Sequence, residues 1–244
     1  MKYDHILRAF YGQPWAILPE TLFKIRQILE GRSAGEQVDP ATLAALAAAR
    51  RSDGVQMVGR VAVLPVFGVL MQRAGLIERA SGAISTEGIG ASLDGLVADR
   101  QVRAIVLAFD SPGGSVFGVE ELARKITAAR DQKKVVALAD SMAASAAYWL
   151  ASQASEVNVT PGGQVGSIGV IAAHTDITKL EELTGLKTTI VASSKYKGEF
   201  APEVVLSEEA RAELQGKVNS YHGLFVGAVA RGRGVSEATV RNDF

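Results

Sequence analysis

Apolar residues recur at two different spacings along the chain, and the spacing changes near residue 54. Before that point, four apolar residues share helical intervals: Leu22, Ile25, Ile28 and Leu29. A second, alanine-rich run over Ala41–Arg50 follows Asp39 and Pro40, which are typical of an N-cap and a first helical turn. The pattern therefore predicts a helical N-terminal extension over residues 1–53.

After residue 54, β-branched apolar runs alternate with helical patterns. The predicted strands are Val61–Leu70, with a break near Pro65, and Val102–Ala108, Lys134–Ala139, Glu156–Val159, Ile168–Ala172 and Lys187–Ala192. The predicted helices are Thr86–Asp99, Val119–Arg130, Ala143–Ser152, Thr178–Leu183 and a long helix from the capping Ser207 to about Ala230. Strands alternating with helices predict an α/β fold with a largely parallel sheet over residues 54–244.

The pattern at the end of the sequence is incomplete. Ser236 caps one more helical segment, which stops at Phe244 before its apolar face repeats. We therefore expect that the domain over residues 54–244 is truncated at its C-terminus.

Composition removes several classes of chemistry. The 244 residues include 26 basic and 26 acidic side chains, so a net charge of zero gives no overall attraction to nucleic acid or to an anionic membrane. The absence of cysteine excludes disulfides and thiolate chemistry, and the three histidines lie far apart in sequence. No apolar run reaches the roughly 18 residues of a membrane span. We expect a cytoplasmic protein without a metal or cofactor, with no nucleic-acid or membrane partner.

The first candidate site is the glycine pair Gly113 and Gly114, in the sequence Asp-Ser-Pro-Gly-Gly-Ser that follows a predicted strand. Two glycines between a strand and a helix let the backbone approach a ligand with its N–H groups free. Such N–H groups stabilise an oxyanion. The alternative is an ordinary strand-to-helix turn, which the pair alone does not exclude.

The second candidate is Ser145, at the start of a predicted helix in Ala-Ala-Ser-Ala-Ala-Tyr-Trp. A serine at this position has backbone donors beside it and a helix dipole that favours developing negative charge. Its small neighbours leave room for a substrate. The alternative is that the alanines only permit close helix packing.

The third candidate supplies a base, which a serine nucleophile needs. No histidine has an evident claim, but Lys195 and Lys197 follow the predicted strand at residues 187–192. Ser–Lys pairs are a known variant of this catalytic arrangement. The lysine must then be neutral, with a pKa well below the usual value of about 10.4, as burial produces. Each lysine by itself is equally consistent with a solvated surface side chain.

Four motifs in this order resemble the protease IV/signal peptide peptidase A family of serine peptidases, over roughly Val61 to Ala230. They are Asp-Ser-Pro-Gly-Gly, Ala-Ala-Ser-Ala-Ala-Tyr-Trp, Val165-Gly-Ser-Ile-Gly-Val170 and Lys195-Tyr-Lys197. The resemblance implies a ClpP/crotonase-type fold, a spiral of ββα units, and peptide hydrolysis by a Ser–Lys dyad. Matched residue by residue, it makes Ser145 the nucleophile and Lys197 the general base.

The same resemblance assigns the supporting residues. Gly114, with Gly113 beside it, matches the oxyanion-hole glycine, and the second donor is the N–H of Ser145 or Ala146. Ser167 either hydrogen-bonds the lysine amine or is a buried hydroxyl that satisfies a backbone group.

The N-terminal segment Pro14-Trp-Ala-Ile-Leu-Pro-Glu20 and the helical extension resemble the phage head-maturation branch of this family, of the lambda-like minor capsid protein C type. That branch implies an endopeptidase that cleaves scaffold and other head proteins during prohead maturation, in the host cytoplasm and within the prohead. Its partners would be scaffold, capsid or portal proteins, and it would form a homo-oligomer whose active sites depend on neighbouring subunits.

Three alternatives stay open at this point. The chain is a bacterial peptidase that degrades signal peptides, or a catalytically silent capsid-assembly protein. The third alternative is a crotonase-type acyl-CoA enzyme, which has the same fold but in whose chemistry the serine and lysine motifs have no role.

Overall fold

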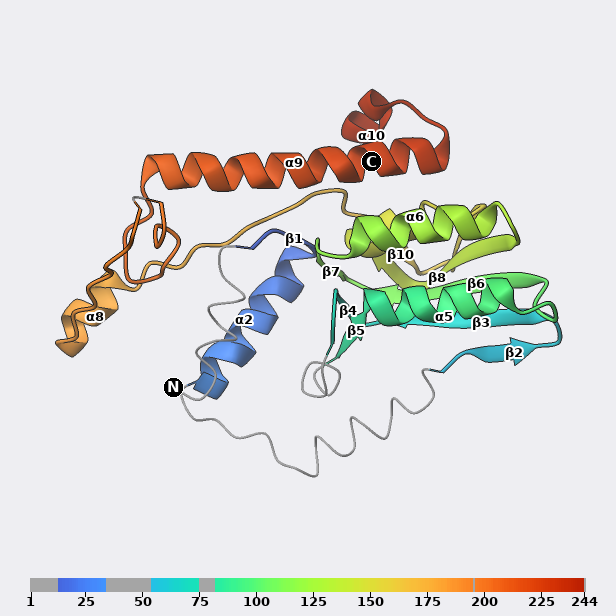
Figure 1. Cartoon of the computed structure of the whole chain (residues 1–244), viewed down its shortest axis with the longest axis horizontal. Coiled ribbons are helices and arrows are strands. Elements are labelled where there is room, and N and C mark those ends of the chain that lie inside the picture. The colour runs from blue at the N-terminus through green and yellow to red at the C-terminus, as the bar shows by residue number, and fades with distance from the viewer. Residues whose placement is uncertain (1–12, 34–53, 75–81, 195, 244) are drawn as a thin grey trace.

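The computed structural model describes residues 13–33, 54–74, 82–194 and 196–243. The predicted alanine-rich helix at residues 41–50 and the candidate Lys195 lie outside the described residues. The described part is a mixed α/β structure with a six-stranded sheet, a four-stranded sheet and helices around them (Figure 1).

The larger sheet is built from the apolar runs of the second half of the pattern. Its strands run in the order β10-β8-β6-β3-β2, and β9 also pairs with β8. Their bounds are β2 Gln56–Val58, β3 Val61–Phe67, β6 Ala104–Ser111, β8 Lys134–Ala144, β9 Glu156–Val159 and β10 Gln164–Gly166. Only the β2–β3 pair is antiparallel among these described strands, which confirms a largely parallel sheet.

The smaller sheet joins short segments in the order β1-β7-β4-β5, namely β1 (Trp15–Ile17), β7 (Gly113–Ser115), β4 (Val69–Met71) and β5 (Ala83–Ser85). The strand β1 was not predicted, because this part of the chain was expected to be helical. It pairs antiparallel with β7 and so ties the N-terminal extension to the sheet. The division of domains at residue 53 stays a prediction.

Helices cover the sheets. They are α2 (Pro19–Ser33), α5 (Thr86–Ala98), α6 (Val119–Arg130), α7 (Ala146–Ala151), α8 (Thr178–Thr184), α9 (Glu208–Arg233) and α10 (Glu237–Asp243). Figure 1 shows α5 and α6 side by side over the larger sheet, with α9 running across above them. None of the described helices is both long enough and apolar enough to cross a membrane.

Two predicted strands are absent, and a third breaks elsewhere. The β3 strand continues through Pro65, which pairs with Ala108 of β6. On the other side of β3, β2 pairs only with residues 61–63, so the missing N–H of Pro65 leaves no β2 carbonyl without a donor. The break falls at Gly68, which has φ of 93° and would place a Cβ 2.2 Å from the carbonyl oxygen of Gly82. Residues 187–192 are exposed and form no strand, because none of the described strands pairs with them. Within the predicted strand at residues 168–172, Ile171 forms only an isolated antiparallel bridge, with Trp15.

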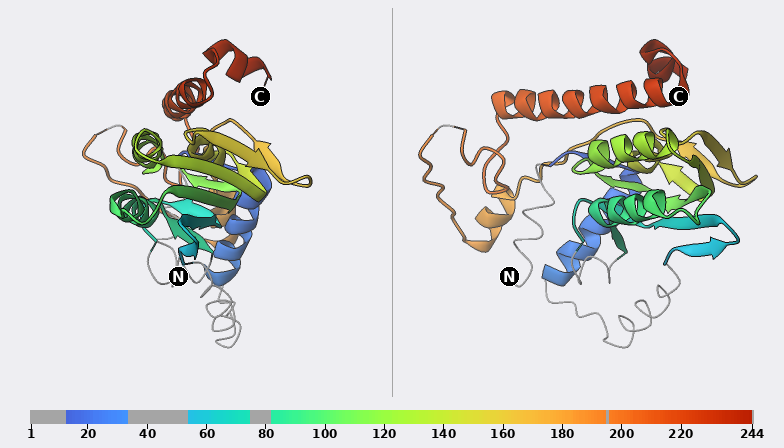
Figure 2. Two further views of the ribbon diagram at one scale, coloured as in Figure 1. Left: turned by 90° about the vertical axis from the view of Figure 1, so that its right-hand side faces the viewer. Right: turned by 45° about the vertical axis from the view of Figure 1, so that its right-hand side comes forward.

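The segment between Ile171 and Ser207, which we call the arm, extends away from both sheets and carries α8 (Figures 1 and 2). The chain then returns along α9, whose capping Ser207 accepts a hydrogen bond from Ala210 N at 3.1 Å, as predicted. The C-terminal half of α9 packs on α7, where Phe225 stacks on Trp149 with ring centroids 4.8 Å apart. Helix α7, which follows the candidate nucleophile, is therefore held in the core by packing against α9.

Candidate active site

Ser145 lies at a sharp turn between the last residue of β8 and the first residue of α7. Its backbone angles are φ 55° and ψ −121°, and among the described residues only Ser145 and Ser167 have a positive φ without being glycine. Such conformations cost about 1–3 kcal/mol and persist where the surrounding structure imposes them. Both residues were candidates from the sequence, so strain and candidate chemistry coincide.

The loop that contains Ser167 holds this turn in place. The N–H of Ser145 donates to the carbonyl oxygen of Gly166 at 2.7 Å, and Ser145 Oγ donates to the carbonyl oxygen of Gly169 at 3.4 Å. The carbonyl of Ser145 accepts from Trp149 N at 2.9 Å, which begins α7. Because the N–H of Ser145 already has a partner, Ala146 is the better candidate for an oxyanion donor.

The glycine pair lies against the same turn. A Cβ on Gly113, which has φ of 96°, would lie 3.0 Å from both Ser145 Cβ and the nitrogen of Ala146. Only glycine allows this close approach. A Cβ on Gly114 would instead lie 1.9 Å from the carbonyl oxygen of Leu70, so that side of Gly114 lies against β4.

Ser111 is a supporting residue that the sequence did not single out. It is fully buried, its Oγ donates to the carbonyl oxygen of Gly68 at 2.6 Å, and it accepts from Gly113 N at 3.3 Å. It therefore ties the glycine pair to the break between β3 and β4. Its place in the Asp-Ser-Pro-Gly-Gly motif was the available signal.

The Ser167 side chain is exposed beside Ser145, so the alternative of a buried hydroxyl is wrong. Its neighbours Gly166 and Gly169 hold the nucleophile, while Ser167 itself is exposed. This position leaves it accessible to a group that approaches from outside the chain.

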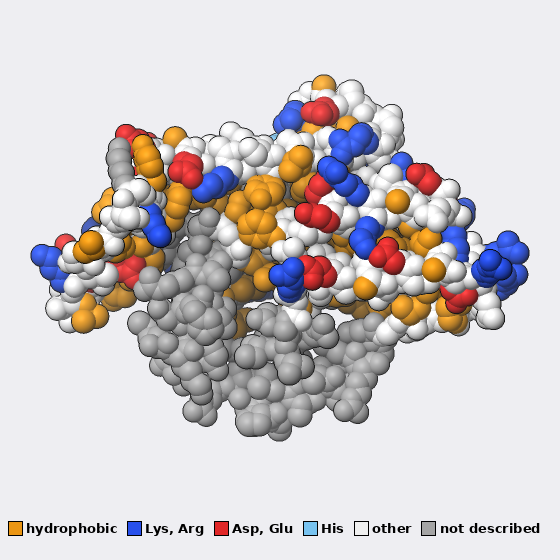
Figure 3. Space-filling view, viewed as in Figure 1, with side chains coloured by type: hydrophobic (Ala, Val, Ile, Leu, Met, Phe, Trp, Pro, Cys, Tyr) orange, Lys and Arg blue, Asp and Glu red, His pale blue; other side chains and the backbone are white. Residues whose placement is uncertain are grey.

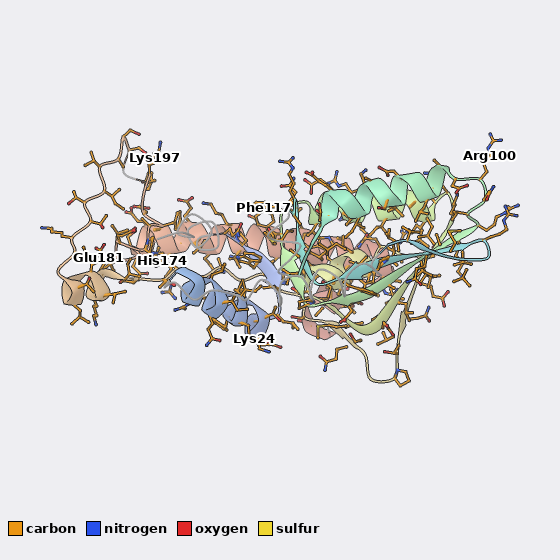
Figure 4. The ribbon with its side chains drawn as sticks, turned by 90° about the horizontal axis from the view of Figure 1, so that it is seen from below. Lys24, Arg100, Phe117, His174, Glu181 and Lys197 are labelled. Atoms are coloured by element: carbon orange, nitrogen blue, oxygen red, sulfur yellow. The ribbon has the colours of Figure 1, made fainter. Side chains whose placement is uncertain are left out.

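Lys197 does not lie at this site within one chain. Its exposed side chain is on the arm. Its backbone N–H donates to Ser194 O at 3.2 Å, and Lys197 and its neighbours line a cavity of about 270 Å³. Figure 4 places it on the arm, on the same side of the molecule as His174 and Glu181 and away from the sheets. In the described part of the chain, Gly169 O is the one hydrogen-bond partner of Ser145 Oγ.

The helix that follows Ser145 is apolar and carries no charged side chain. The α7 segment Ala-Ala-Tyr-Trp-Leu-Ala has no ionisable group other than Tyr148, and all of its residues are buried. Burial raises the pKa of the Tyr148 phenol, a shift that Arg233 partly opposes. The phenol is therefore neutral at physiological pH, and a base for Ser145 must come from another element.

Residues 127–243 match the family model of peptidase family S49. The chain carries a peptidase family S49 domain. The match includes Ser145, Ser167 and Lys197, and therefore three of the four motifs, and it confirms the resemblance to a family of serine peptidases.

Phage proteins are among the proteins to which the chain is similar. The chain is 35% identical over 191 residues to the capsid assembly protease C of Escherichia phage lambda, which covers 78% of this chain and 44% of that protein. It is 36% identical over 181 residues to the head-tail preconnector protein GP5 of Enterobacteria phage P21, covering 74% of this chain and 36% of that protein. Protease 4 of Salmonella typhi is 28% identical over 176 residues, covering 72% and 28% respectively. The chain thus spans less than half the length of these relatives.

Proposed function

We propose that this chain is a serine endopeptidase that cleaves scaffold and other head proteins during phage prohead maturation. The observation that carries the proposal is the strained turn at Ser145, with Gly113 and Ala146 directly beside it. The similarity to a capsid assembly protease and to a head-tail preconnector protein supports a phage head as the setting.

We also propose that the domain has the ClpP/crotonase-type fold. Two successive stretches follow the same order, a strand of the larger sheet, a short strand of the smaller sheet and then a helix. These are β3, β4, α5, with β5 before the helix, and β6, β7, α6. That repetition supports a spiral of ββα units.

In the proposed reaction, the neutral amine of Lys197 takes the proton of Ser145 Oγ as the oxygen attacks the substrate carbonyl carbon. The N–H groups of Gly114 and Ala146 stabilise the oxyanion of the tetrahedral intermediate. The lysine ammonium then protonates the departing amine as the peptide bond breaks. Water, deprotonated by the same lysine, hydrolyses the acyl-enzyme.

The position of Lys197 supports a site that is shared between two copies of the chain. Since the arm carries Lys197 away from the Ser145 of its own chain, we propose that each active site takes its lysine from a neighbouring protomer. The arm has exposed apolar side chains that favour such contact, among them Leu183 at 85% and Val191 at 93% exposure (Figure 3). Burying each one contributes about 1.5–3 kcal/mol.

Cleavage of scaffold protein by purified variants tests the function. Ser145→Ala and Lys197→Ala, which remove the nucleophile and the base, are each expected to lose activity by several orders of magnitude. Lys197→Arg is expected to lose as much, because a guanidinium stays protonated and cannot act as a base. Lys187→Ala, an exposed lysine on the same arm, is the control and retains activity. Lys195→Ala is also expected to remain active.

Three results would contradict the proposal. Full activity in Ser145→Ala rules out the nucleophile. Cleavage of signal peptides but not of scaffold favours a bacterial signal-peptide-degrading enzyme. Binding to head proteins without cleavage that depends on Ser145 favours a silent assembly protein.

Light scattering tests the oligomer. Leu183→Ser with Val191→Ser is expected to shift the wild-type oligomer toward monomer and to reduce cleavage in parallel, since both exposed side chains then disfavour burial. A wild-type monomer with full activity would contradict the shared site.

A further inference from the structure

The strand β1 lies between the two segments that flank the nucleophile. On one side it pairs antiparallel with β7, with Ala16 opposite Gly114 and Ile17 opposite Gly113. On the other side, Trp15 N donates to Ile171 O at 2.7 Å and Ile171 N donates to Trp15 O at 2.8 Å. The N-terminal segment, in blue in Figure 1, therefore fills the gap between the glycine pair and the end of the loop that holds Ser145.

The carbonyl oxygen of Ala16 lies close to the candidate site. The point that a Cβ would occupy on Gly113 is 2.2 Å from Ala16 O and 3.0 Å from both Ser145 Cβ and Ala146 N. These atoms surround one point, so a peptide carbonyl of β1 lies beside the nucleophile. Ser145 is only 1% exposed while β1 is in place, so little of its side chain is open to a protein substrate.

Side chains along β1 alternate in a way that suits this position. Trp15 and Ile17 lie in a small apolar cluster with Leu22 of α2, while Ala16 belongs to the main core beside Ser145. Ala16 thus packs a small side chain into the main core, and its neighbours anchor the strand through the separate cluster on the opposite face.

We propose that residues 15–17 occupy the position of a bound substrate strand, and that this segment must leave before a protein substrate can bind. Extended peptides bind by adding a strand to free sheet edges, with backbone hydrogen bonds and alternating side-chain pockets. β1 uses the edges of β7 and Ile171 in this way. The identity of Ser145 as the nucleophile rests on the proposed function, whereas the occupancy itself does not.

The anchoring cluster is separate from the main core, which makes release feasible. Trp15, Ile17 and Leu22 pack with partly buried side chains of α2 and β4 and with Ile171, and form their own apolar cluster. Removing the Trp15 and Ile17 side chains is therefore expected to free the strand while the main core stays folded.

Peptide binding tests the occupancy without requiring catalysis. The probe is a fluorescein-labelled peptide with the sequence of residues 13–20, added to the full chain carrying Ser145→Ala. Adding Trp15→Ala with Ile17→Ala is expected to tighten its binding at least about tenfold, because the competent state becomes more populated. Phe23→Ala with Ile28→Ala, both exposed on α2, is the matched control and leaves binding unchanged.

Cleavage by proteins with Ser145 intact separates the two proposals. We call the protein with Trp15→Ala and Ile17→Ala the loosened protein. If it binds peptide more tightly but never cleaves scaffold, the occupancy stands and the proposed function fails. If cleavage depends on Ser145 but binding and rate are the same in wild-type and loosened proteins, the occupancy is wrong and the function stands.

A reversible lock provides a second test that does not depend on removing the anchors. Leu18 N donates to Pro112 O at 3.0 Å across the β1–β7 edge, and the chain has no cysteine of its own. Leu18→Cys with Pro112→Cys is expected to lose peptide binding and cleavage when oxidised and to regain both on reduction. Equal binding and cleavage in a sample shown by mass to be oxidised would overturn the proposal.

Discussion

The contact between Phe225 and Trp149 makes a quantitative prediction about what supports the nucleophile. Phe225 is fully buried on α9, and its ring stacks on Trp149 of α7 at 4.8 Å with planes 10° apart. Phe225→Ala removes this stack and leaves a cavity under the helix that begins at Ser145. The expected loss of stability is about 3–5 kcal/mol.

The chain offers a matched control in a second aromatic contact with α9. Phe117 packs edge-on against Tyr221 of α9, with centroids 6.1 Å apart, but is 40% exposed. Phe117→Ala is therefore expected to cost only about 1 kcal/mol. Urea unfolding at one fixed protein concentration measures both variants. If Phe225→Ala costs no more than Phe117→Ala, α9 does not hold α7 in the way described.

Two further predictions concern the site and the C-terminal helices. Gly113→Ala is expected to lose cleavage and about 1–3 kcal/mol of stability, because its Cβ would lie 2.2 Å from Ala16 O at a positive φ. Gly162→Ala is the control: it has open space around it and is expected to change neither cleavage nor stability. Urea unfolding and scaffold cleavage check this pair, and normal stability in Gly113→Ala would contradict it. Burial, and to a smaller extent the charge of Arg241, lowers the pKa of His222 below its ordinary value of 6.5. The unfolded chain therefore takes up a proton on this histidine before the folded chain does, so the free energy of unfolding is expected to fall as pH drops from 6.5 toward the lowered pKa. A proton NMR titration midpoint of His222 at or above 6.5 would refute this.

The sequence predicted the local elements well and the strand pairing less well. Helices α5 and α6 begin and end within one residue of their predicted bounds, because their apolar faces are local properties. Ala143 and Ala144 were predicted as helix from their propensity, yet they extend β8 through pairing with Val165 and Gly166. Tertiary pairing overrides propensity in such runs. The strand β1 has only three residues and distant partners, so no periodicity announced it.

The candidate site was predictable as a set of motifs but not as a geometry. The neighbourhood of Gly113, Ser145 and Ser167 agrees with the motifs that named them. The roles of Gly166 O and Gly169 O in holding Ser145 came only from the fold, since a backbone carbonyl has no sequence signature. The distance of Lys197 from the nucleophile of its own chain also had no local signal, because spacing in sequence does not determine which residues approach each other in space.

Mixing two inactive variants tests the shared dyad most directly. Purified Ser145→Ala and Lys197→Ala proteins are dissociated, combined in equal amounts and reassembled, with assembly confirmed by light scattering. If each site takes its serine and lysine from different protomers, random mixing restores about a quarter of the wild-type scaffold cleavage. No recovered cleavage in a fully mixed oligomer would contradict the account.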